Sequence, residues 1–156
     1  MTTKSRGDFT KILYRFHNDT LGQEVVETLW VSVVDKDKGI YKLENIPFYA
    51  KSLAYGDLVE AEYDEDEDAL VLSDILEFSG HSTVQVVMLI ESASLEEIRA
   101  IFHGLGCDTE GLNSRYFAID VPATVPFKPV KEQLLALQEN KIADFAIACW
   151  SDKHQG

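Results

Sequence analysis

The pattern of apolar residues changes near residue 80, and this change limits the folds open to the chain. Before that point, short apolar segments alternate with turn residues, which is typical of β-strands. After it, strand-like segments alternate with two amphipathic helical segments. A chain that carries both patterns one after the other is expected to belong to the α+β class.

About five strands are expected in the first 80 residues. Apolar alternation and enrichment in Val, Thr and aromatic residues mark them, at residues 11–16, 24–34, 40–43, 58–63 and 70–78. Pro47 interrupts the pattern because proline has no N–H to donate to a sheet. Such a meander usually curls on itself, so the sequence predicts a small β-barrel-like or curled antiparallel sheet.

The second half predicts the order strand, helix, strand, strand, helix, strand. The first helix starts at a capping box formed by Ser94 and Glu97. It ends at Gly104 and Gly106, and the second helix has Pro129 in its first turn. The strands are expected at residues 83–91, 107–112, 115–121 and 143–150. This order is that of a ferredoxin-like βαββαβ sandwich.

The stretch Ser79-Gly80-His81-Ser82 is the best candidate for a boundary. We therefore expect a β-rich half at residues 9–80 and a ferredoxin-like half at residues 81–152. The connection is short, so the two halves should pack tightly, as two units or as a single domain.

Charge excludes several classes of partner. The 156 residues include 14 Lys and Arg against 27 Asp and Glu, for a net charge of −13. Phosphates would be repelled, so we expect neither nucleic acid nor an anionic membrane as a partner. With 46% hydrophobic residues the chain has enough apolar surface for a folded core.

The sequence is typical of a cytoplasmic protein. The longest strongly apolar run, residues 86–90, is too short for a signal peptide or a membrane span. Cys107 and Cys149 fit that compartment as free thiols, and their spacing matches no zinc motif. No glycine-rich phosphate loop occurs, and no cofactor or metal is expected.

The most unusual stretch is a run of five acidic residues, which two further acidic residues precede. It resembles the start of a calcium loop, but Ala69 and Ile75 stand where that loop needs Gly and Glu. One interpretation is a solvated hairpin tip that keeps the protein soluble. The other is a surface that attracts a basic protein partner, because like charges on one loop accelerate association. The partner-binding residues would be Asp64, Glu65, Asp66, Glu67 and Asp68, with Glu60 and Glu62 on the same strand face.

A second candidate site lies at the boundary. His81 and Ser82 are adjacent, and Asp57 would orient His81 if the fold brought the two together. An active nucleophile needs such an orienting group, but no Gly-x-Ser-x-Gly elbow occurs in the chain. The alternative interpretation is a structural turn whose hydroxyls bind backbone groups.

A series of short motifs resembles one bacterial family. Glu27-Thr28-Leu29-Trp30, Asn45-Ile46-Pro47-Phe48-Tyr49-Ala50, Tyr55-Gly56-Asp57 and Ser79-Gly80-His81-Ser82-Thr83 follow one another in this order. The chain is similar, over about residues 10–150, to domain-of-unknown-function family 4265. The resemblance implies a small, stand-alone cytosolic bacterial protein. It brings no assigned reaction and no catalytic residues, and the acidic run lies outside the family pattern.

Two hypotheses of function follow. The first is a non-catalytic acidic binding protein, most concretely an immunity or antitoxin-type inhibitor that masks a basic active site on a toxin domain. The alternative is an enzyme or small-ligand binder with its site near His81, Asp57 and Ser82. Since no catalytic constellation is evident in the sequence, the first hypothesis is preferred.

Overall fold

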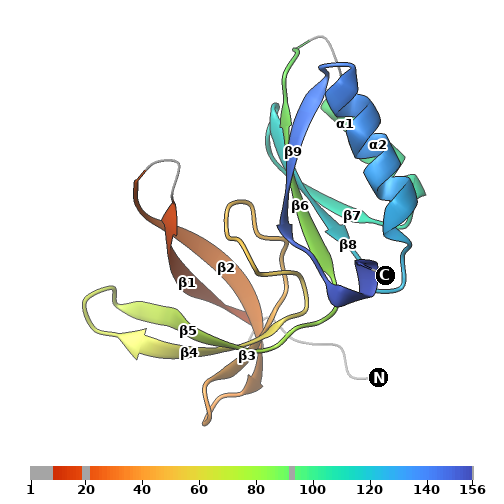
Figure 1. Ribbon diagram of the computed structural model, residues 1–156. Coiled ribbons are helices and arrows are strands. Elements are labelled where there is room, and N and C mark those ends of the chain that lie inside the picture. Colours follow the sequence, from red (N-terminus) through yellow and green to blue (C-terminus); the bar gives the residue numbers. More distant parts are fainter. Residues whose placement is uncertain (1–8, 19–21, 92–93, 156) are drawn as a thin grey trace. The chain divides into compact units, whose positions relative to one another are not determined.

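The computed structural model describes residues 9–18, 22–91 and 94–155 (Figure 1). The described residues contain nine strands and two α-helices, so the α+β class expected from the sequence is confirmed. None of these helices has the length and apolar character needed to cross a bilayer. The chain divides into two compact units, which are residues 1–45 with 55–79 and residues 46–54 with 80–156.

Unit 1 is built from five consecutive strands. They are β1 (Phe9–Asn18), β2 (Gln23–Asp35), β3 (Ile40–Leu43), β4 (Leu58–Asp64) and β5 (Ala69–Glu77). Each strand pairs antiparallel with the next, and the first strand also pairs with the last, because Leu13 in β1 lies parallel to Val71 in β5. Alternate side chains point inward, as strand geometry requires, and the buried ones include Ile12, Leu29, Val31, Leu43 and Val59.

Unit 2 contains a four-stranded antiparallel sheet and both helices. Its elements are β6 (Ser82–Met88), α1 (Leu95–Gly104), β7 (Asp108–Asn113), β8 (Tyr116–Val121), α2 (Phe127–Glu139), β9 (Ala143–Cys149) and a 3₁₀ turn at Asp152–His154. The strands lie in the order β7-β8-β6-β9, and both helices cover the same face of the sheet (Figure 1). Val84, Phe117 and Ile119 on that face are fully buried against helix residues such as Phe102 and Leu134.

Residues 46–54, which we call the strap, cover part of the helix-free face of the same sheet. Alternation along β6 and β8 places Thr83, Gln85 and Tyr116 on this face, opposite the core side chains. Tyr116 donates from its hydroxyl to the carbonyl of Phe48, and Gln85 donates to the carbonyl of Ala50 at 3.3 Å.

Two further contacts hold the end of the strap. Thr83 Oγ1 donates to the carbonyl of Leu53 at 2.8 Å, and the backbone N–H of Ser52 donates to the carbonyl of Ala148 at 2.8 Å. Leu53 is fully buried. The sheet therefore binds mainly the backbone groups of the strap.

Candidate functional site

The acidic tip, which consists of Asp64, Glu65, Asp66, Glu67 and Asp68, forms the turn between β4 and β5. The carboxylate of Asp64 builds this turn, because its Oδ1 accepts from the backbone N–H of Asp66 at 2.8 Å and of Glu67 at 3.3 Å. A short acidic side chain commonly stabilises a turn in this way. Asp68 completes the turn at φ +51°, a left-handed conformation that Asp adopts more readily than most residues.

A cation of the same unit already lies against the tip. The guanidinium of Arg15 on β1 forms a hydrogen-bonded ion pair with Glu67, and its Nη2 lies 4.0 Å from Asp64 Oδ2. Asp64 thus uses one oxygen for the turn and presents the other to a positive charge. The side chains of Arg15, Asp64 and Glu67 are each about one-third exposed, so water screens these pairs.

A shallow open depression of about 330 Å³ lies beside the tip. Its walls combine carboxylates with apolar side chains, contributed by Glu62, Tyr63, Asp64, Glu65, Val71, Leu72 and Ser73. The hydroxyl of Tyr63 hydrogen-bonds Asp68, which is the main reason that the pKa of Tyr63 is raised. An extended cationic side chain needs this combination of negative groups for its head and apolar groups for its stem.

Glu60 and Glu62 alternate with Asp64 along β4, as the sequence predicts. Glu62 lines the depression. The backbone carbonyl of Glu60 accepts from Ser73 Oγ at 3.2 Å, and its carboxylate lies 3.4 Å from the same hydroxyl. The structure therefore ties Glu60 to β5.

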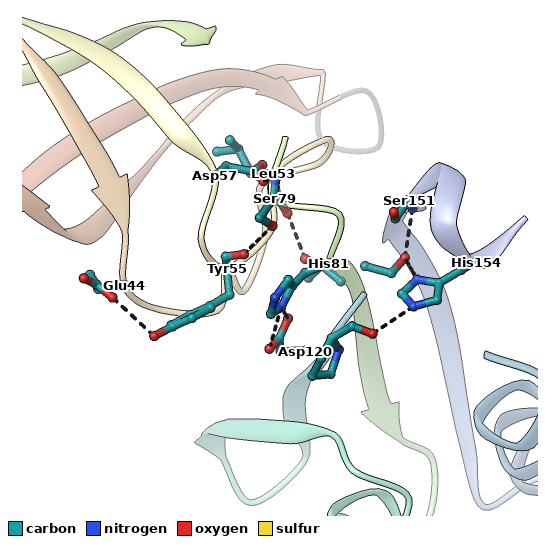
Figure 2. A network of polar contacts seen from close by, with 12 residues as sticks. Glu44, Leu53, Tyr55, Asp57, Ser79, His81, Asp120, Ser151 and His154 are labelled. Carbon is teal, nitrogen blue, oxygen red and sulfur yellow. Dashed lines mark hydrogen bonds and ion pairs between the residues drawn. The ribbon is translucent and has the colours of Figure 1, made fainter. Parts of the chain in front are cut away.

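His81 is held by Asp120 and not by Asp57, the orienting group that the sequence suggests. His81 Nδ1 lies 2.8 Å and 3.1 Å from the two oxygens of Asp120 on β8 (Figure 2). The Asp120 side chain is 5% exposed and that of His81 is 23% exposed. In the neutral ring this bond keeps the proton on Nδ1 and the lone pair on Nε2, which is the tautomer of a general base.

Ser82 pairs with a different histidine. Its Oγ lies 2.6 Å from Nδ1 of His154, and Nε2 of His154 donates to the carbonyl of Pro122 at 3.0 Å (Figure 2). Ser82 also accepts from the backbone N–H of Ser151 at 2.9 Å and is fully buried. The pair holds the C-terminal turn in place.

Asp57 is buried, and its carboxylate binds a backbone N–H and not His81 in the contacts drawn in Figure 2. It is 1% exposed, and its Oδ1 accepts from the backbone N–H of Ser79 at 2.8 Å. Its own carbonyl accepts from the N–H of Leu43. These bonds join three segments of unit 1.

Arg15, Asp120 and His154 are the residues that sequence reasoning missed. Asp120 carried a detectable signal, because it is the single charge in the strand Tyr116–Val121 and that strand is otherwise apolar. Such a carboxylate needs a partner when buried. Arg15 and His154 stand alone in the sequence, and only the fold shows what they contact.

Comparison with known proteins gives a fold and a family. The structure is similar to the crystal structure of a hypothetical protein from Neisseria gonorrhoeae, with a TM-score of 0.79 and 19% identity over 91% of this chain and 95% of that one. At this identity the likeness concerns the fold alone. No curated protein matches the chain significantly. The family model described as "Domain of unknown function (DUF4265)" matches residues 27–145, and the chain therefore belongs to the DUF4265 family.

Proposed function

We propose that this protein is a non-catalytic binding protein whose acidic tip binds a basic surface on a partner protein. In its most concrete form it is an inhibitor of the immunity or antitoxin type, which covers a basic active site on a toxin domain. The observation that carries the proposal is the ion pair of Arg15 with Glu67 and Asp64. The tip holds a guanidinium within its own chain, so its carboxylates are arranged to accept one.

The depression beside the tip supports the same proposal. Glu62, Asp64 and Glu65 supply negative charge, while Val71 and Leu72 supply apolar contact for the stem of an Arg or Lys side chain. Because the carboxylates are partly exposed, each ion pair contributes little affinity, and their joint effect falls mainly on the association rate.

The test is affinity capture from a lysate of the host, at low and at high salt, with three forms of the protein. The first is the natural chain, and the second carries Glu65→Gln and Asp66→Asn. The third carries Glu96→Gln and Glu97→Gln on α1, which changes the net charge by the same amount at an exposed site in unit 2. The captured proteins are identified by mass spectrometry.

We expect one protein partner that the natural chain and the α1 variant capture, and that the tip variant and high salt release. Equal capture by the tip variant and the α1 variant contradicts the proposal. Capture that increases with salt contradicts it as well, since ion pairs weaken as salt rises.

The second candidate is an enzyme or small-ligand binder at His81, and the bond from His81 to Asp120 favours it. This pair supplies the oriented base that the sequence predicts with Asp57 as the orienting group. A panel of metabolites screened by thermal shift tests it. A ligand whose shift is lost in His81→Ala and kept in Lys38→Ala, at an exposed turn of unit 1, supports this candidate.

The proposal also covers the fold type of each unit and the cellular compartment of the protein. We propose that unit 1 is a small β-barrel, since its first strand pairs with its last, and that unit 2 is a ferredoxin-like sandwich. The order β7-β8-β6-β9 with both helices on one face supports the second assignment. We propose the bacterial cytoplasm as the compartment, and the absence of a disulfide between Cys107 and Cys149, both described residues, supports it.

A further inference from the structure

The solvent-facing side of the unit 1 sheet carries a row of exposed apolar side chains along β2. Val26, Trp30 and Val34 are 48%, 48% and 53% exposed, and their spacing of four residues places them on one face of the strand. Leu29 and Val31, which flank Trp30, point the other way and are fully buried. Three large apolar side chains in one exposed row are more than scattered surface residues, and such patches commonly mark a site of interaction.

Two cations lie across from this row on β1. The antiparallel register places Lys11 opposite Trp30 and Arg15 opposite Val26. The ammonium of Lys11 lies 4.8 Å from the centroid of the Trp30 ring, which is the distance of a cation–π contact. Apolar surface and positive charge thus lie side by side on the β1–β2 face, which consists of Lys11, Arg15, Val26, Trp30 and Val34.

The backbone of Trp30 is fixed by the residues that follow β3. Its N–H donates to Oδ1 of Asn45 at 2.8 Å, and its carbonyl accepts from the N–H of Glu44 at 2.9 Å. A partner would therefore meet an aromatic side chain on a backbone that is already in place, and binding would cost little conformational entropy. Tryptophan is also enriched among the interface residues that contribute most of the binding energy.

The charge of the β1–β2 face indicates the chemistry of the partner. The chain has 27 acidic against 14 basic residues, yet the charged residues of this face are both cations. Arg15 is paired with Glu67 and Asp64, whereas Lys11 forms no ion pair with the residues that the structure describes. A carboxylate next to an apolar side chain would complement Lys11 next to Trp30.

A single strand of nucleic acid would also use an aromatic ring beside a cation, because bases stack on the ring and phosphates pair with the charge. Val26 and Val34, however, offer no hydrogen bond or charge to a phosphate. The net charge of −13 repels a polyanion as well. The observations therefore favour a peptide over a nucleic acid.

We propose that the β1–β2 face binds a segment of a partner protein in which an Asp or Glu lies next to a large apolar side chain. The apolar side chain packs on Trp30 and Val26, and the carboxylate pairs with Lys11. The acidic tip would bind the opposite charge, so this surface goes beyond the function proposed above.

Selection from a peptide display library on the immobilised natural chain tests the chemistry of the ligand. We expect enrichment of peptides in which Asp or Glu is adjacent to Trp, Phe, Leu or Met. The acidic tip cannot select such peptides, so the result does not depend on the tip. Enrichment of basic peptides alone would agree with the tip proposal and overturn this one, and a library without any enriched peptide overturns it too.

Titration of an enriched acidic peptide, followed by fluorescence polarisation, tests the residues. The natural chain is compared with Trp30→Ala, with Lys11→Glu, and with Lys131→Glu at an exposed position of α2, which changes the net charge by the same amount as Lys11→Glu. We expect the affinity to fall about thirtyfold for Trp30→Ala, the usual effect of losing an interface anchor. It should fall about tenfold for Lys11→Glu and stay nearly unchanged for Lys131→Glu.

Equal affinities of Lys11→Glu and Lys131→Glu overturn the proposal, and so does an unchanged affinity of Trp30→Ala. Circular dichroism checks that each variant is folded. If Trp30→Ala does not fold, the comparison of Lys11→Glu with Lys131→Glu decides alone. A labelled oligothymidine that binds the natural chain more tightly than the peptide does, and loses its binding in Lys11→Glu, would overturn the proposal in favour of a nucleic acid.

Discussion

Glu110 is an ionisable side chain whose partial burial disfavours its charged form. It lies half-buried on β7, where its carboxylate accepts a hydrogen bond from the backbone of Ile46 at the start of the strap. Burial, aided by the charge of Asp108, raises the pKa of Glu110 despite that bond. A raised pKa in an acid means that folding favours the protonated form. The stabilisation is full below the unfolded pKa and is lost as the pH rises through the folded one.

We therefore expect Glu110→Gln to stabilise the protein at neutral pH. Glutamine keeps an acceptor for Ile46 and removes the desolvated charge, so the melting temperature at pH 7 should rise by about 1–3 °C. The advantage should shrink as the pH is lowered toward 4, where Glu110 itself becomes protonated. Differential scanning calorimetry between pH 4 and pH 8 measures both effects.

Asp144→Asn is the control, because we expect it to change the stability at neutral pH in the opposite direction to Glu110→Gln. Hydrogen bonds from Gln138 and from the N–H of Phe145 lower the pKa of Asp144. Its contribution to stability is present above the unfolded pKa and is lost as the pH falls through the folded one. Asp144→Asn should thus destabilise the protein at neutral pH, with the difference disappearing in acid. A common sign for both variants would contradict the argument from burial.

Cys107 should be chemically inert in the folded protein. Burial in the core of unit 2, with smaller effects from the charges of Asp120 and Asp108, raises its pKa to about 12. At pH 8 only about one thiol in ten thousand is then ionised, and the thiolate is the reactive form. A maleimide or disulfide reagent should therefore modify at most the half-buried Cys149 in the native protein. Peptide mass spectrometry checks this, and a label on native Cys107 would contradict it.

Single residues show where sequence reasoning reaches its limit. The capping role of Ser94 is predicted and confirmed, since its hydroxyl accepts from the N–H of Glu97 at 3.3 Å. A cap involves residues three positions apart, so the sequence contains all of it. The bond of His81 to Asp120 joins residues 39 positions apart, and no local pattern selects Asp120 over Asp57. For this reason the sequence predicts the acidic turn between two strands but not the partner of His81.

Among the elements, the strands and helices follow the sequence closely. The helix predicted from Ser94 extends over Leu95–Gly104, and the second begins at Phe127, two residues before Pro129. Ile98, Phe102, Val130, Leu134 and Leu137 are buried as their helical spacing indicates, whereas Ile101 and Leu135 are 39% and 44% exposed. A helix that packs one face on a sheet buries only one stripe of its surface, and these two residues lie at the margin of that stripe.

The strap is the element that periodicity does not reveal. It has neither the period of a strand nor that of a helix, yet Ile46, Ala50 and Leu53 are 2% exposed or less. Its position depends on side chains of the sheet that reach its carbonyls. Since those side chains occur 30 or more residues later in the chain, no local window of sequence contains the interaction.

We expect Thr83→Val to destabilise the protein although it hardly changes the volume of the side chain. The hydroxyl of Thr83 donates to the buried carbonyl of Leu53, and its loss leaves that acceptor without this donor. An unsatisfied buried group of this kind costs about 1–3 kcal/mol in the free energy of unfolding. Urea unfolding followed by circular dichroism measures the change.

Ser73→Ala is the matched control, because its hydroxyl donates to a backbone carbonyl at an exposed position, that of Glu60. Water replaces an exposed bond, so the free energy of unfolding should change by less than about 0.5 kcal/mol. Equal decreases in the free energy of unfolding for Thr83→Val and Ser73→Ala would show that the hydrogen bond from Thr83 to the strap stabilises the protein no more than an exposed one.

For the whole molecule, the excess of negative charge should matter more than any single ion pair. A net charge of −13 on 156 residues disfavours the compact state through self-repulsion. The melting temperature should therefore rise between about 10 and 150 mM salt, as the screening length falls from about 30 Å to 8 Å. Calorimetry with sodium chloride and with choline chloride separates screening from the binding of a particular cation. A melting temperature that falls with both salts would show that attractive pairs such as Arg15 with Glu67 outweigh the repulsion.

The position of the strap in the chain sets an order of events during synthesis. The ribosome completes residue 54 long before it completes β9, which ends at Cys149. At the usual 5–20 residues per second, the 95 residues between them (149 − 54) take roughly 5–20 s to make. Throughout that interval the four-stranded sheet that the strap binds is incomplete, so the strap, with its apolar residues Ile46 and Leu53, lacks part of its binding surface. The nascent chain thus exposes the apolar strap in the part that is already synthesised. The speed of translation determines how long chaperones and neighbouring chains can bind it.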